Sequence, residues 1–226
     1  MKNIVSITSA KPDVFTTLAA SQIARRIAID HPEKKVLLLS ISDEPELLEK
    51  IIDYRAEVFG GSFEDCFKDI TNFAFCCLPK PFFKSGTSPD FAEQEAKNLS
   101  NEYDIVICDA VGGIENASAL GFLFASEYTY FVFDHTAESI KRYIWLNPLL
   151  DKLGIHVKGE ILDHSAGRPE YGYGEYANAL GPNTKADPYI IDDDRNLDEI
   201  DILAKSISLD QFGHDISGGF EDRGDR

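Results

Sequence analysis

The sequence has few cysteines, few glycines and prolines, and no long apolar run. Its 226 residues include only 16 Gly and 10 Pro, which excludes collagen-like, low-complexity and wholly disordered chains. The four cysteines form no Cys-x-x-Cys pair and have no histidine at metal-ligand spacing. We therefore expect reduced thiols in a cytoplasmic protein. No segment reaches the roughly 18 apolar residues that a membrane span requires.

Basic residues are also scarce. The chain has 22 Lys and Arg against 39 Asp and Glu, which gives a formal net charge of −17. Because such a surface repels phosphate backbones and anionic lipid headgroups, we expect no nucleic-acid partner. Residues 211–226 are polar and rich in Asp, with no apolar face. This pattern predicts a frayed tail and no direct membrane anchor.

The chain does contain short apolar runs that alternate with helical patterns. Strands are expected over residues 4–7, 36–39, 73–78, 105–108, 128–133, 155–162 and 189–191. Helices are expected over 16–29, 46–59, 89–100, 118–124, 197–207, and 139–153 with a kink or break at Pro148. This order predicts an α/β fold: one domain over residues 1–210, built as a doubly wound, mostly parallel sheet with helices on both faces. Ligand sites then lie at the carboxyl ends of the strands.

The loop after the first strand carries the most informative motif. Residues 8–17 read Thr-Ser-Ala-Lys-Pro-Asp-Val-Phe-Thr-Thr and resemble the deviant Walker A loop of the MinD/ParA superfamily, VTSGKGGVGKTTTAANLA. The resemblance puts the family's signature lysine at Lys11, its phosphate-gripping lysine at Thr16 and its Mg²⁺-binding threonine at Thr17. The family's glycines are replaced by Ala10, Pro12, Asp13 and Phe15.

Later strand ends resemble the family's other motifs in the same order. Lys-Val-Leu-Leu-Leu-Ser-Ile-Ser-Asp resembles KVLLIDLDP, with Ser40 and Ser42 in place of the two aspartates. Tyr-Asp-Ile-Val-Ile-Cys-Asp-Ala-Val-Gly-Gly resembles YDYVIIDTPPG, with Asp109 at the Walker B position and Gly113 at the switch glycine. Asp163 replaces the adenine-reading Asn of the family's GVVLNR segment.

A last segment, residues 188–192, resembles the family's IPYD, so the resemblance covers residues 1 to about 207. It implies a P-loop NTPase-like fold. It also implies nucleotide-binding positions at Lys11, Thr16, Thr17, Asp109, Gly113 and Asp163, with Thr17 and Asp109 as metal ligands only if Mg-nucleotide binds.

The departures from the motif argue against efficient ATP hydrolysis. Each lost glycine places a Cβ where phosphate approaches, Pro12 also removes an N–H donor, and Asp13 adds a negative charge. Thr16 cannot supply the cation that neutralises the transferred phosphate. The resemblance therefore implies a degenerate nucleotide site that binds ATP and Mg²⁺ weakly or not at all. The implied function is a non-hydrolysing scaffold or localisation factor, as in the TadZ/CpaE-like proteins of Flp pilus assembly.

Two other functions stay open. Retained Lys11, Thr17 and Asp109 favour a slow, atypical ATPase or kinase that binds ATP through an unconventional loop. A site filled by Phe15 and Pro12 would instead favour a pure protein-interaction module.

Each retained residue also has a simpler structural interpretation. Lys11 could be a solvated loop lysine. The Thr17 hydroxyl could bond to backbone groups in the first turn of its helix. Asp109 could be held by the backbone N–H groups of residues 111–113.

Protein partners are expected in two places. Tyr171, Tyr173 and Tyr176 form a cluster that indicates a partner-binding loop, a phosphoacceptor cluster, or merely an aromatic loop. The resemblance also implies a homodimer, in which Lys11 reaches across a two-fold interface toward the other subunit.

Overall fold

The computed structural model describes residues 3–9, 11, 16–40, 71–77, 88–134, 136–163, 189–191 and 197–212. The predicted helix over 46–59 and nearly all of the predicted tail lie outside these residues. No helix within the described ranges is both long enough and apolar enough to cross a bilayer.

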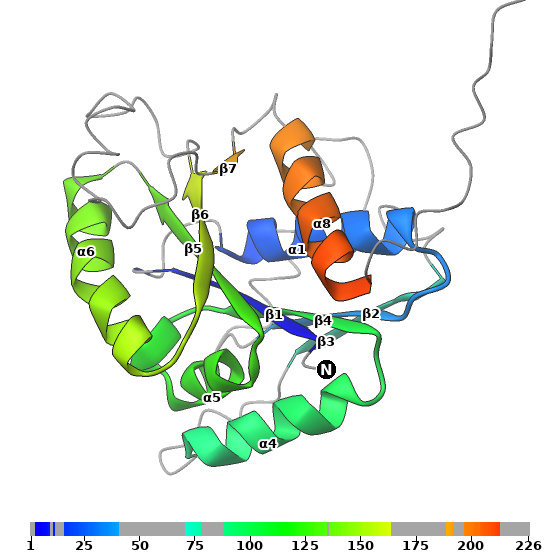
Figure 1. Ribbon diagram of the computed structural model, residues 1–226, viewed down its shortest axis with the longest axis horizontal. Helices are drawn as coiled ribbons and strands as arrows, with labels where there is room; N and C mark the ends of the chain where they lie inside the picture. Colours follow the sequence, from blue (N-terminus) through cyan, green and yellow to red (C-terminus); the bar gives the residue numbers. More distant parts are fainter. Residues whose placement is uncertain are drawn as a thin grey trace, which may run out of the picture.

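Seven parallel strands form one sheet, as the alternating sequence pattern predicts (Figure 1). The strands are β1 Ile4–Ser9, β2 Val36–Ser40, β3 Phe73–Cys77, β4 Ile105–Ala110, β5 Tyr128–Asp134, β6 Val157–Asp163 and β7 Tyr189–Ile191. They are arranged in the order β3-β2-β4-β1-β5-β6-β7. Strands β2, β3 and β4 lie on one side of β1, and β5, β6 and β7 lie on the other, so the sheet is doubly wound. This arrangement confirms the predicted fold class.

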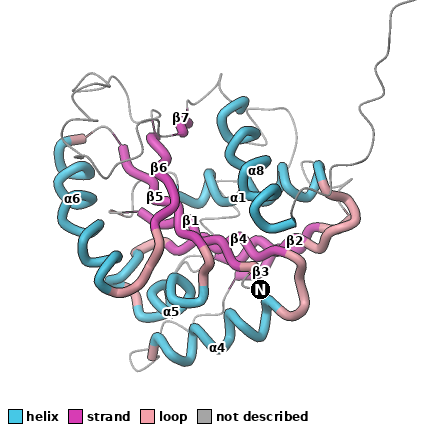
Figure 2. Tube along the Cα trace, viewed as in Figure 1, coloured by secondary structure: helices cyan, strands magenta, loops and turns pink. Residues whose placement is uncertain are grey.

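Helices cover both faces of this sheet (Figure 2). They are α1 Thr16–Asp30, α4 Pro89–Ser100, α5 Ala117–Ala125, α6 Ala137–Lys152 and α8 Leu197–Phe212, with a short 3₁₀ turn, η2, at Gly113–Glu115. One apolar core joins α1 and α8 to the sheet, and a second joins α4, α5 and α6 to the opposite face. Strands β1, β2 and β4 are buried along their whole length, which explains their continuous apolar runs.

Several details differ from the sequence prediction. Helix α8 continues to Phe212, beyond its predicted end at residue 207 and into the first two residues of the predicted tail. Helix α6 continues through Pro148 without a break, and Pro148 is exposed on its outer side. Strands β2, β4, β5 and β6 run past their apolar residues to include Ser40, Asp109, Asp134 and Asp163. These terminal polar residues form the site described below.

Gly121 allows α5 and α4 to cross closely. A Cβ atom at this position would lie 2.3 Å from the carbonyl oxygen of Pro89 and 2.6 Å from Cβ of Ala92. Both atoms belong to the neighbouring helix, and one is backbone, so no side-chain rotation relieves the clash. The two helices would have to move apart and open the core that Ala92 helps to fill.

We therefore expect Gly121→Ala to lower the free energy of unfolding by about 3 kcal/mol. Gly154→Ala is the matched control, because its Cβ meets no atom within 4 Å although its φ of +74° disfavours a side chain. The control should cost about 1 kcal/mol. Urea unfolding of both variants measures the difference. Equal losses would show that the helix crossing tolerates a methyl group.

Candidate functional site

Polar residues lie at or next to the ends of two pairs of adjacent strands, β2 with β4 and β5 with β6, which flank β1 at the carboxyl edge of the sheet. Ser40 ends β2, Asp109 is the next-to-last residue of β4, Asp134 ends β5 and Asp163 ends β6. The sheet register places Ser40 beside Asp109, and Asp134 beside Asp163. All four are buried. Because a buried polar group is costly without a partner, the contacts of these residues determine what the edge can bind.

Asp109 is held by two hydroxyl groups. Thr17 donates a hydrogen bond from Oγ1 to Asp109 Oδ2 at 2.8 Å, and Ser40 donates from Oγ to the same oxygen at 3.2 Å. Oδ1 of Asp109 is buried and accepts no hydrogen bond from any residue that the structure describes. The donors are therefore hydroxyls on α1 and β2, and not the backbone N–H groups of residues 111–113. Thr17 likewise bonds this carboxyl group rather than the backbone of its own helix.

Burial shifts the ionisation of Asp109. The side chain is inaccessible to solvent, and loss of water raises its pKa to about 6. The hydrogen bonds from Thr17 and Ser40 act in the opposite direction but offset only part of the shift. The neighbouring Cys108 thiol has a raised pKa for the same main reason, with the charge on Asp109 as a second cause.

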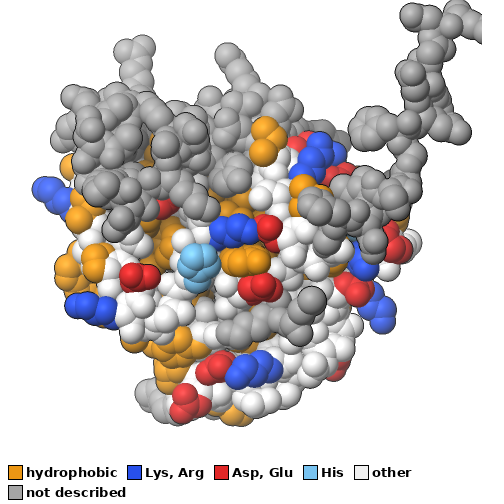
Figure 3. All heavy atoms as spheres, viewed as in Figure 1, with side chains coloured by type: hydrophobic (Ala, Val, Ile, Leu, Met, Phe, Trp, Pro, Cys, Tyr) orange, Lys and Arg blue, Asp and Glu red, His pale blue; other side chains and the backbone are white. Residues whose placement is uncertain are grey.

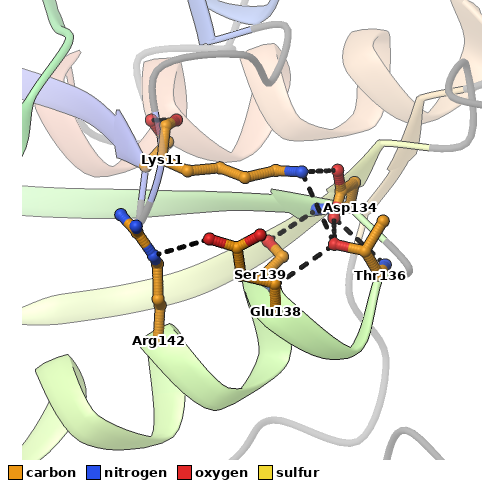
Figure 4. A network of polar contacts seen from close by, with 7 residues as sticks. Lys11, Asp134, Thr136, Glu138, Ser139 and Arg142 are labelled. Atoms are coloured by element: carbon orange, nitrogen blue, oxygen red, sulfur yellow. Dashed lines mark hydrogen bonds and ion pairs between the residues drawn. The ribbon is translucent and has the colours of Figure 1, made fainter.

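Lys11 is paired within its own chain (Figure 4). Its Nζ lies 2.5 Å from Asp134 Oδ2 and 3.5 Å from the Thr136 hydroxyl. The lysine side chain is 17% exposed and that of Asp134 only 4%, so the ion pair is largely shielded from water. Lys11 is thus not a solvated loop lysine. It contacts a carboxylate of its own chain.

Thr136 completes this second cluster. Its backbone N–H and its hydroxyl donate to Asp134 Oδ1 at 3.1 and 2.6 Å, and its own Oγ1 accepts from the N–H of Ser139 at the start of α6. Burial alone would raise the pKa of Asp134, but the hydrogen bonds from Lys11 and Thr136 outweigh it and lower that pKa. The cluster therefore links the loop after β1 to the first turn of α6.

Gly113 has a backbone conformation that favours glycine. Its φ is +48°, and a Cβ atom would lie 3.2 Å from the Thr8 hydroxyl and 3.5 Å from the Ser9 carbonyl oxygen. Thr8 in turn donates to the Ala110 carbonyl at 2.8 Å. The loop after β4 thus passes tightly over β1, which accounts for the glycine without any ligand.

The other predicted site residues are partly described. Thr16 is buried at the start of α1, and Asp163 is buried at the end of β6. Tyr171, Tyr173 and Tyr176 lie outside the described residues, as do positions 10 and 12–15 of the loop. The part of the site that the structure does describe brings Thr17 to Asp109, and Lys11 to Asp134.

Sequence reasoning missed Asp134 and Thr136. The sequence contained a pattern that could have identified both. Asp134 directly follows an apolar run, as Asp109 does. Thr136 then stands three residues before Ser139, the spacing of a helix N-cap. These two positions could have been assigned to the same edge of the sheet as Lys11.

Solved structures with this fold cover nearly the whole chain. A ParA family ATPase from Chlorobium tepidum has a TM-score of 0.64 at 16% identity, covering 95% of this chain and 96% of that one. The MinC:MinD cell division complex of Aquifex aeolicus has a TM-score of 0.60 at 19% identity, covering 93% and 89%. A plasmid partition protein of Borrelia burgdorferi bound to AMPPNP has 0.63 at 15% identity, covering 96% and 100%. The chain has the MinD/ParA fold. No family model and no curated protein matches it in sequence.

In a MinD/ParA-like site, Mg²⁺ would be expected beside Thr17 and Asp109, and the residues present fit such an ion. A hydroxyl and a carboxylate are hard oxygen ligands, and the buried Oδ1 of Asp109 is left without a hydrogen bond. Among the described residues, no group of three or more His, Cys, Asp and Glu could hold a metal ion. A cation would therefore depend on water or on phosphate oxygens for most of its ligands.

The raised pKa of Asp109 predicts a pH-dependent stability. A carboxyl group whose pKa rises on folding stabilises the protein when the pH is below the pKa of that group in the unfolded chain, which is near 4. For Asp109 this contribution is lost as the pH rises through about 6. Asp109→Asn removes the ionisation and keeps the shape. We expect its stability relative to wild type to increase by about 3 kcal/mol between pH 4 and pH 7, since one pKa unit corresponds to about 1.4 kcal/mol.

Asp134→Asn is the opposite-sign control. The lowered pKa of Asp134 means that its carboxylate stabilises the fold above the unfolded pKa and that this contribution is lost as the pH falls. This variant should therefore lose most stability relative to wild type at neutral pH. Urea unfolding across the pH range tests both, and a pH-independent difference for Asp109→Asn would contradict the first prediction.

The Lys11–Asp134 pair should also be measurable by a double-mutant cycle. Lys11→Met leaves a buried carboxylate unpaired, so we expect a loss on the order of 3 kcal/mol. Adding Asp134→Asn should recover much of it, because the unpaired charge is then removed. Lys97→Met is the control: its ion pair with Glu93, at 2.7 Å, is exposed on α4 and should contribute less than about 1 kcal/mol. Additive losses at Lys11 and Asp134 would mean that the two do not interact.

Proposed function

We propose that this protein is a MinD/ParA-like scaffold or localisation factor with a degenerate nucleotide site that does not hydrolyse ATP. The ion pair between Lys11 and Asp134 carries this proposal. Phosphoryl transfer depends on cations that neutralise the transferred phosphate, and this lysine is already neutralised by a carboxylate of its own chain. Before it could contact a phosphate, or another subunit, the pair with Asp134 would have to open.

The residues at the carboxyl edge of the sheet support the same proposal. Thr16 occupies the position of the phosphate-gripping lysine and is buried at the start of α1. Ser40 occupies the position of an expected acid, and its hydroxyl donates a hydrogen bond to Asp109. Three buried carboxyl groups, at Asp109, Asp134 and Asp163, lie at the carboxyl edge of the sheet and disfavour an anionic ligand unless cations accompany it.

One observation favours the alternative of a slow, atypical ATPase or kinase. Thr17 and Asp109 lie 2.8 Å apart at their oxygens, so two hard oxygen ligands are already together where a nucleotide-bound Mg²⁺ would sit. Weak binding of Mg·ATP without hydrolysis would agree with the scaffold function, whereas hydrolysis would support the ATPase or kinase function. The third alternative, a site occluded by Phe15 and Pro12, concerns residues outside the described ranges.

A scaffold implies protein partners. Among the similar structures, one is a MinC:MinD complex and another is a plasmid partition protein, so the fold occurs in proteins named for assemblies and for partition. We propose protein partners for this chain as well, in a role like that of the TadZ/CpaE-like proteins of Flp pilus assembly. The altered Walker A loop is the basis for that finer placement. The net charge of −17 disfavours DNA or an anionic membrane as a direct partner.

The proposal is tested by binding and turnover together. In a thermal-shift titration with Mg·ATP, Mg·ADP and Mg·GTP, we expect small shifts that appear only at high ligand concentration. Hydrolysis should not exceed a buffer control, because the charge-stabilising groups of the transition state are missing or engaged. A turnover approaching about 1 s⁻¹, abolished in Asp109→Ala, would identify an enzyme and refute the scaffold. The Asp109→Asn variant is measured alongside Asp109→Ala, because it removes the charge while keeping the shape of the side chain and so shows whether a loss of activity comes from the charge or from unfolding.

A further inference from the structure

Asp163 is a third buried carboxyl group at the carboxyl edge of the sheet, separate from the two clusters around Asp109 and Asp134. It ends β6 and is 1% exposed. It already has a partner within the chain, so a ligand would have to compete for it. In the motif that residues 159–164 resemble, an asparagine that reads adenine stands at this position. An aspartate has different hydrogen-bonding groups, and this difference changes which base can be bound there.

The register of the sheet places Asp163 at a distance that suits a nucleotide base. One row of residues crosses β1, β5 and β6 in register: Ser9, Val132 and Ile161. Lys11, Asp134 and Asp163 each follow that row by two residues. Since neighbouring strands lie about 4.8 Å apart, β6 is about 10 Å from β1 across the sheet. The resemblance places the phosphates in the loop after β1, and one nucleotide is long enough to span that distance.

Asp163 also lies on the face of the sheet that α1 covers. Side chains alternate along a strand, so Asp163 shares the face of Ile161, which belongs to the core beneath α1 and α8. Thr17, in the first turn of α1, contacts Asp109 at the same edge. Phosphates at the start of α1 and a base at Asp163 would therefore lie on one face of the sheet.

We propose that Asp163 makes this site select guanine nucleotides over adenine nucleotides. The inference rests on the proposed nucleotide site and names the base that the site accepts. An ionised carboxylate only accepts hydrogen bonds, through its two oxygens. Guanine presents two adjacent N–H donors, at N1 and N2, that match these oxygens. Adenine presents one donor, the N6 amino group, beside a ring nitrogen that is itself an acceptor, so one carboxylate oxygen would face a lone pair.

An asparagine at this position has the opposite preference. Its side-chain amide carries one acceptor oxygen and one NH₂ donor, which match the N6 amino group of adenine and the neighbouring ring nitrogen. Against guanine, the NH₂ group would meet an N–H donor. Because a site that leaves polar groups unpaired discriminates strongly, Asn and Asp at position 163 favour different bases. The replacement of Asn by Asp163 therefore alters the base without removing the residue that reads it.

A free nucleotide fits this site better than a guanine within RNA or DNA. The net charge of −17 repels a polyphosphate backbone. Figure 3 shows Lys and Arg side chains scattered among Asp and Glu on the visible face, with no continuous basic surface among the residues drawn in colour. A free nucleotide brings only its own few phosphate charges, and these can be neutralised by the Mg²⁺ that accompanies it.

Binding of nucleoside diphosphates tests the base preference separately from hydrolysis. A ligand-observed NMR titration, which suits weak binding, measures the dissociation constants of Mg·GDP, Mg·ADP and Mg·IDP. We expect GDP to bind about tenfold more tightly than ADP, or better, because it makes one more hydrogen bond to a charged acceptor. IDP carries inosine, which keeps the N1–H of guanine and lacks the N2 amino group. Its dissociation constant should therefore lie between the other two.

Asp163→Asn should reverse this order. We expect Mg·GDP to bind about tenfold more weakly to this variant than to wild type, and Mg·ADP to bind it more tightly than Mg·GDP does. Asp151→Asn is the matched control, because it removes the same charge from an exposed position on α6 and should leave all three dissociation constants unchanged. Circular dichroism checks that both variants are folded. If Asp163→Asn does not fold, the order measured with wild type decides the proposal.

Four outcomes would overturn the proposal. Wild type could bind ADP as tightly as GDP, or it could bind neither nucleotide. A folded Asp163→Asn variant could keep the wild-type order. Finally, a guanine-containing RNA oligonucleotide could bind more tightly than Mg·GDP, which would make the ligand a nucleic acid. All four leave the non-hydrolysing scaffold in place, whereas hydrolysis of ATP would refute the scaffold and leave the preference between diphosphates unaffected.

Discussion

A carboxyl group buried at the end of a parallel strand must find hydrogen-bond donors nearby, and this constraint organises the carboxyl edge of the sheet. Asp109 recruits the hydroxyls of Thr17 and Ser40, which joins β4 to α1 and β2. Asp134 recruits Lys11 and Thr136, which joins β5 to the loop after β1 and to α6. The Asp134 cluster gives both carboxyl oxygens a partner, and the Asp109 cluster gives a partner to Oδ2 alone, in a sheet whose covered faces exclude water.

The two clusters differ in electrical character. Asp134 forms an ion pair with the ammonium group of Lys11, and its pKa is lowered although the side chain is buried. Asp109 receives only hydroxyl dipoles, so burial dominates and its pKa rises to about 6. Near neutral pH, one carboxylate is stably charged, and the other is poised close to its titration point. A divalent cation would alter the contacts of Asp109 far more than those of Asp134, because of these two carboxyl groups only Asp109 has an oxygen without a hydrogen bond among the described residues.

The sequence predicted the architecture well because the signal is spread over many residues. Continuous apolar runs and intervening helical patterns specify a parallel sheet regardless of any single residue, and every strand and helix that the structure describes lies at such a pattern. The site was predicted less completely. Thr17 and Asp109 were assigned through a motif, whereas the Lys11–Asp134 pair joins residues 123 positions apart, through the adjacency of β1 and β5. The order of strands in a sheet is not encoded in local periodicity.

The contacts at the carboxyl edge also determine what a nucleotide would have to displace there. Here Lys11, Thr17 and Ser40 all direct their donors at carboxylates of the chain itself, so a ligand must compete for them. The cost of that competition is the free energy of the contacts that it breaks, which for a shielded ion pair is substantial.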